Sequence, residues 1–195
     1  MRKSVKTLVF ITIILLLFNQ SYAQLKLPLL NGITNDVKKV IEDYPNRFVH
    51  LMGEMVAEHT QSTDYQCNFN VNGAEESIIT RYSAKKEMCS WQALMLTTDN
   101  FEKAKQKFKS LFGQLNTLSV NTGKASFRLK GIYESPEEKR KFTNVLFSFE
   151  PSSESFKKLK VEISIQYVEP MEWKVKVLVY DREREDEERG KTVEE

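Results

Sequence analysis

The chain has 195 residues, with 29 basic and 27 acidic side chains, two histidines and two cysteines. Seven glycines and five prolines are too few for a fibrous or low-complexity protein. A chain of this size buries roughly 70% of its unfolded surface, so it needs neither a metal nor a disulfide to hold its core.

The N-terminus has the pattern of a secretory signal peptide. Three basic residues precede an uncharged apolar run of eleven residues, Leu8–Phe18, which is too short to span a bilayer comfortably. Ser21 and Ala23 are small residues at the third and first positions before a cut, so we expect cleavage after Ala23. The mature protein is then periplasmic or secreted by a bacterium and keeps no transmembrane anchor. The alternative is an uncleaved anchor.

Cleavage changes the charge of the protein. Residues 1–23 carry three of the 29 basic side chains and no acid, so the mature chain has 26 basic and 27 acidic side chains and a net charge of −1. Nucleic acids recruit strongly basic proteins. A nearly neutral chain therefore argues against nucleic acid as a partner.

The first half of the mature chain predicts one helix and four strands. The helix is expected near residues 34–44, where apolar residues recur at helical spacing before Pro45. The strands are expected at 47–58, 64–71, 76–82 and 88–97, with an Asn-Gly turn between the second and the third.

The second half predicts a longer helix and four more strands. Asp99 and Glu102 occupy capping-box positions at the start of a helix over 99–115. Its apolar stripe comprises Phe101, Ala104, Phe108, Leu111, Phe112 and Leu115. The strands, near 125–133, 142–150, 159–167 and 173–179, alternate apolar and polar residues, as in an antiparallel sheet with one wet face.

This order of elements predicts an α+β fold. We expect a duplicated α-β4 arrangement, with an antiparallel sheet and two helices packed on one face. Residues 24–180 form a single domain in this interpretation, with possible α-β4 halves at 34–97 and 99–180. The charged residues 181–195 are expected to be a disordered tail.

Cys67 and Cys89 are candidates for a disulfide, because an exported protein folds under oxidising conditions. Their predicted strands are two apart, which is roughly 9.5 Å, whereas a disulfide needs Cα atoms within about 7 Å. Bridged and free thiols therefore both stay open. No partner histidines stand at a zinc-site spacing, so we expect no metal.

The sequence contains no catalytic or cofactor motif. Neither His50 nor His59 belongs to a recognisable set of nucleophile, base and orienting group. Glu54 interrupts an apolar strand beside Gly53, and it has two interpretations. It is either a buried acid lining a cleft, or an exposed acid turned to solvent by a bulge at Gly53, and we favour the bulge.

The apolar residues leave two functional hypotheses. Trp91, Met95 and Phe108 are typical of an adaptable core, and they also mark where a small apolar ligand would bind. The first hypothesis is a non-enzymatic exported module that binds an unknown protein partner through its sheet edge or open face. The alternative is a carrier that holds a small apolar ligand between helices and sheet. Neither hypothesis needs a cofactor.

Overall fold

A computed structural model describes residues 32–83, 88–122 and 125–181. The predicted signal peptide 1–23, its cleavage site after Ala23, and residues 182–195 of the predicted tail lie outside the described residues. The elements in chain order are α2 (Ile33–Asp43), η1 (Tyr44–Asn46), η2 (Val49–Leu51), β1 (Met52–Glu58), β2 (Ser62–Cys67), β3 (Glu76–Tyr82), β4 (Met88–Thr98), α3 (Phe101–Leu115), β5 (Ser119–Thr122), β6 (Ala125–Gly131), β7 (Phe142–Glu150), η3 (Glu154–Phe156), β8 (Leu159–Val168) and β9 (Glu172–Asp181).

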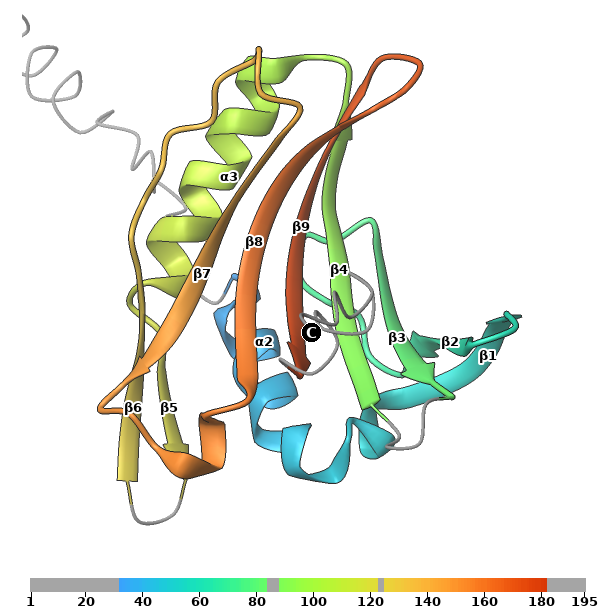
Figure 1. The fold of residues 1–195 in the computed structure, drawn as a ribbon, viewed down its shortest axis with the longest axis vertical. Helices are drawn as coiled ribbons and strands as arrows, with labels where there is room; N and C mark the ends of the chain where they lie inside the picture. Colours follow the sequence, from blue (N-terminus) through green and yellow to red (C-terminus); the bar gives the residue numbers. More distant parts are fainter. Residues whose placement is uncertain (1–31, 84–87, 123–124, 182–195) are drawn as a thin grey trace, which may run out of the picture. The chain divides into compact units, whose positions relative to one another are not determined.

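The strands form one antiparallel sheet of nine strands in the order β1-β2-β3-β4-β9-β8-β7-β6-β5. Each half of the chain is a meander, and the last strands of the two meanders, β4 and β9, pair at the centre (Figure 1). Trp91 of β4 lies opposite Val179 of β9, which in turn lies opposite Val161 of β8. The predicted α+β class with an antiparallel sheet is therefore confirmed.

The duplicated α-β4 arrangement is not confirmed. Five strands follow α3 rather than four, because β5 was not predicted. This strand is only four residues long and largely polar, so it gives little of the alternation that reveals a strand. In addition, α2 packs on β5 and β9 rather than on the strands of its own half.

Both helices cover the same part of the sheet. α3 packs on β4, β8 and β9, and α2 packs on β5, β9 and α3. The apolar stripe of α3 is buried as predicted, except that Phe112 is half-buried and stacks on Phe147 with ring centroids 5.8 Å apart. On β9 the residues beneath the helices are all buried: Trp173, Val175, Val177 and Val179.

Strands β1 and β2 lie at the end of the sheet away from α3 and receive little cover (Figure 1). Most of their side chains are exposed or half-buried, whereas those of β8 are mostly buried. No helix in the described part of the chain is long and apolar enough to cross a membrane.

Candidate functional site

The turn that leads into β1 has an unusual backbone. α2 ends at Asp43, and the following η1 contains Pro45, which cannot continue a helix. Arg47 and Phe48 then both adopt left-handed conformations, with φ of 56°. Such conformations cost about 1 kcal/mol or more for residues other than glycine, and they persist only where the surroundings impose them. The first strand was predicted to begin at residue 47. It begins at Met52 instead, because the left-handed residues cannot belong to a strand.

Burial of Phe48 is one of the forces that impose this turn. Its side chain is fully buried, and its ring lies 6.1 Å from that of Tyr44. The Tyr44 hydroxyl donates a hydrogen bond of 2.8 Å to Asp181 Oδ2 at the end of β9. The turn is thereby fixed to the central strand of the sheet.

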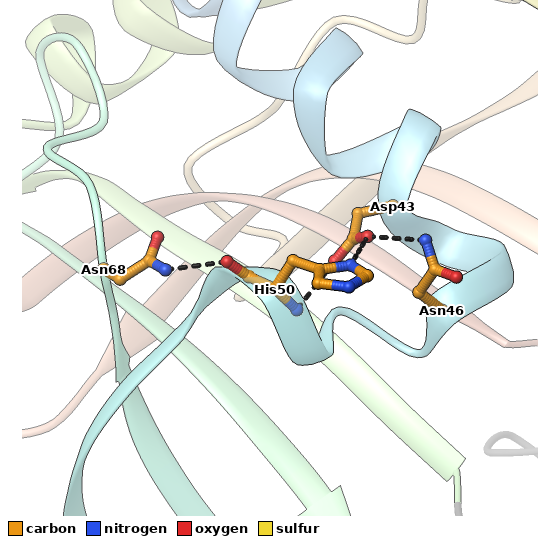
Figure 2. Close-up of polar contacts among 4 residues, drawn as sticks. All are labelled: Asp43, Asn46, His50 and Asn68. Atoms are coloured by element: carbon orange, nitrogen blue, oxygen red, sulfur yellow. Dashed lines mark hydrogen bonds and ion pairs between the residues drawn. The ribbon is translucent and has the colours of Figure 1, made fainter.

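Hydrogen bonds to Asp43 are the second force. Figure 2 shows its carboxylate between Asn46 and the His50 ring. Asp43 Oδ1 accepts from Asn46 Nδ2 at 2.8 Å and lies 2.7 Å from His50 Nδ1, while Oδ2 accepts from the His50 backbone N–H at 3.2 Å. The Asp43 side chain is 11% exposed and that of His50 is 68% exposed. Asn68, just beyond β2, donates to the His50 carbonyl at 2.7 Å and so ties the turn to the neighbouring strand.

An aspartate that orients a histidine supplies two of the three members of a hydrolytic triad. The third member would be a nucleophile beside the His50 ring. No serine, threonine or cysteine hydroxyl or thiol contacts His50 among the described residues. Nor do the described residues contain a group of three metal-ligating side chains. His59 pairs separately with Asp64, at 3.3 Å, on the exposed side of β2. The hydrogen bonds of Asp43 to the Asn46 side chain and to the His50 backbone N–H anchor the start of β1.

Strand β1 is the free edge of the sheet, and it is irregular. Its pairing with β2 shifts register between Met52 and Met55 and again between Met55 and Ala57. Gly53 lies in the first irregularity, where a Cβ would approach the Gln66 carbonyl oxygen to 2.9 Å. Only glycine fits there without displacing backbone.

Large apolar side chains are exposed along this edge. Val49 is 57% exposed, Met55 59% and Val56 54%. Val56 lies in the second irregularity of β1, directly after Met55, so the two exposed apolar side chains are adjacent in the bulged part of the edge strand. We call Val49, Met55 and Val56 the apolar edge.

A polar hollow of about 400 Å³ adjoins the apolar edge at the bulge. Its lining residues are Gly53, Glu54, Gln66, Cys67, Asn68, Phe69 and Asn70. Glu54 is exposed, so the hypothesis of a buried acid at this position is wrong. The physical reason is the position of β1 at the edge of the sheet with little cover, where the neighbouring Gly53 and Met55 are exposed as well.

Among the residues that the structure describes, the buried acids are Asp43 and Glu162, and the sequence pattern did not reveal either. Glu162 is 8% exposed on the sheet face opposite α3, and it accepts hydrogen bonds from Tyr180 Oη at 2.7 Å and from Asn144 Nδ2 at 3.1 Å. It occupies a polar position of an alternating strand, which predicts exposure. Only the cross-strand arrangement of its two donors distinguishes it from an ordinary solvated glutamate.

The predicted apolar site is part of the core. Trp91, Met95 and Phe108 are at most 3% exposed. None of the three lines the hollow at the bulge or a second hollow of about 410 Å³ near η3. Trp91 and Met95 lie on β4 and Phe108 lies on α3, and these two elements pack against each other in the core. This agrees with the core-packing interpretation that the sequence favoured.

Cys67 and Cys89 are not joined by a disulfide in this structure. Cys89 lies opposite Arg81 of β3, and Arg81 lies opposite Thr63 of β2, four residues from Cys67. The two cysteines are thus separated by two strand spacings and by roughly 13 Å along the strand. This separation is well beyond the reach of a disulfide.

A comparison of the chain with protein families, with curated proteins and with solved structures finds no match. We therefore base the functional proposal on the geometry of β1 and its anchoring turn.

Proposed function

We propose that the protein is an exported, non-enzymatic interaction module that binds an extended segment of another protein along β1. The observation that carries this proposal is the apolar edge: Met55 and Val56 of β1, an edge strand of the sheet, and Val49 in the preceding η2 are each more than half exposed. Large exposed apolar side chains that gather on one part of a protein surface are typical of an interaction site.

The bulges determine how such a segment would be recognised. A regular edge strand pairs with almost any extended chain, and natural proteins use bulges to prevent this. Strand β1 has two register irregularities, so it offers no long continuous ladder of backbone hydrogen bonds. Recognition would therefore depend mainly on the side chains of the apolar edge, which gives selectivity.

The packing of the core favours this function over the carrier alternative. A carrier needs a cavity between helices and sheet, and the residues predicted to line it, Trp91, Met95 and Phe108, are closely packed there. The anchoring turn favours the same choice, because a strained and hydrogen-bonded turn holds β1 in one position for a partner.

Selection from a displayed library of random peptides tests the proposal. We expect the wild-type protein to enrich peptides that the variant Met55→Ser/Val56→Ser binds at least about tenfold more weakly, because two apolar side chains lose their burial against the peptide. The control variant Ile132→Ser/Met171→Ser removes two exposed apolar side chains elsewhere and should bind like wild type. Equal loss of binding in both variants would contradict a site at β1.

Export is a separate part of the proposal, supported by the apolar run Leu8–Phe18 and the small residues before the expected cut. We expect the protein recovered from a bacterial host to have the denatured mass of residues 24–195 with both thiols reduced. A mass that retains residues 1–23 would overturn export. Additional mass in the native spectrum that disappears on unfolding would favour the carrier instead.

A further inference from the structure

The charges beside the apolar edge indicate the chemistry of the partner. Glu54 and Glu58 flank Met55, Val56 and Ala57, and both glutamates are exposed. Neither forms an ion pair within the part of the chain that the structure describes. The strand thus presents two apolar side chains between two uncompensated negative charges.

The hollow at the bulge strengthens this indication. Beside Glu54 it is lined by the amide side chains of Gln66, Asn68 and Asn70, and by no lysine or arginine. Asn68 Nδ2 donates to the His50 carbonyl, which leaves its Oδ1 as an acceptor without a donor among the described residues. One basic side chain lies beside the hollow: Lys39 Nζ is 4.0 Å from the centroid of the Phe69 ring, and Phe69 is a lining residue. Lys39 forms no ion pair with Glu54 in the described part of the chain.

A carboxylate accompanied by amide oxygens is a site for a cationic side chain. Lysine and arginine carry only donors, so they match a surface of acceptors and compensate its charge. A neutral or acidic partner would leave Glu54 unpaired at the interface, which is unfavourable.

We infer, on the basis of the proposed function, that the partner segment is basic as well as apolar, and that one of its lysine or arginine side chains occupies the hollow beside Glu54. Glu54 and Glu58 lie on either side of the second register irregularity of β1, which falls between Met55 and Ala57. The partner therefore carries a basic residue on each side of the apolar residues that contact Met55 and Val56.

The same peptide selection tests this inference when it is repeated with Glu54→Lys/Glu58→Lys. We expect wild type to enrich lysine and arginine on both sides of an apolar stretch, and the charge-reversed variant to enrich aspartate and glutamate there instead. The control Glu102→Lys/Glu138→Lys makes the same change in net charge at two exposed acids elsewhere, and it should keep the basic preference.

The affinity of a synthetic peptide measures how much the Glu54 charge contributes to binding. For acetyl-Thr-Lys-Val-Ile-Val-Lys-Thr-amide, titration calorimetry should show binding about two- to fivefold weaker to Glu54→Gln than to wild type, and a smaller difference at high salt.

The outcomes separate this inference from the proposed function. If the enriched peptides depend on Met55 and Val56 but show no basic preference, or the same preference after charge reversal, the inference is overturned and the proposed function stands. If wild type enriches nothing beyond Met55→Ser/Val56→Ser, both are overturned.

Discussion

Asp43 is the residue on which the anchoring turn depends most. Its carboxylate receives the Asn46 amide, the His50 backbone N–H and the His50 ring, and it is largely buried. We expect Asp43→Ala to lower the free energy of unfolding by about 1–3 kcal/mol, because the Asn46 amide, the His50 backbone N–H and the His50 ring lose their largely buried, charged acceptor. His50→Ala removes only an exposed ring and should cost about 0.5 kcal/mol or less. Urea denaturation measures both, and equal effects would contradict the role of Asp43.

Cys67 gives a prediction about pH. Burial is the main cause that raises the pKa of its thiol above the ordinary value of 9.0, and the Phe69 backbone and the neighbouring Trp91 and Ser77 side chains oppose it only in part. The Trp91 indole lies close by without a regular hydrogen bond among the described residues.

A thiol whose pKa is raised in the folded state favours folding while it is neutral. Its contribution is therefore complete below pH 9 and is lost as the pH rises through the ordinary value towards the folded one. We expect urea denaturation of the wild type at pH 7 and pH 10 to show a larger loss of stability than in Cys67→Ala. Identical losses in the two proteins would show that the thiol stays unperturbed.

At the scale of elements, the sequence predicted what depends on periodicity. The apolar stripe of α3 and the alternating strands β7, β8 and β9 follow directly from side-chain burial at helical or two-residue spacing. A hydrogen bond, rather than periodicity, determines which residue caps the N-terminus of α3. The helix cap is Asn100, whose Oδ1 accepts from the Lys103 backbone N–H at 3.0 Å, rather than the predicted Asp99.

The start of β1 was predicted wrongly for a related reason. Residues 47–51 are rich in apolar side chains, as in a strand, but Phe48 is buried by a left-handed turn and not by strand pairing. The anchoring by Asp43 links residues that no periodic pattern connects. The candidate site could therefore be predicted only as an irregularity at Gly53 and Glu54.

Gly53 provides a test of the bulge as an element. In Gly53→Ala the new Cβ would lie 2.9 Å from the Gln66 carbonyl oxygen, so backbone must move. We expect a loss of about 1–3 kcal/mol in stability and weaker peptide binding. Gly113→Ala is the matched control: a Cβ there meets nothing within 4 Å in the last turn of α3, where Gly113 is exposed, and the change should stabilise the protein by about 0.5–1 kcal/mol. Equal stability of the two variants would contradict the close approach at the bulge.

At the scale of the whole described molecule, cover and exposure are unevenly distributed. The two helices bury one face of the strands β4–β9, and β1 and β2 are left with little cover at one end of the sheet. The other edge is the short polar strand β5, which contacts α2. One edge of the sheet is thus protected and the other carries exposed apolar and acidic side chains, which is why we propose that binding occurs at β1.

Amide hydrogen exchange with and without a selected basic peptide tests this assignment most directly. We expect the peptide to slow amide exchange in β1 and in the residues that line the hollow, and to leave exchange in β5, β7 and β8 unchanged. Slower exchange confined to β7 and β8, with no change in β1, would contradict binding at β1.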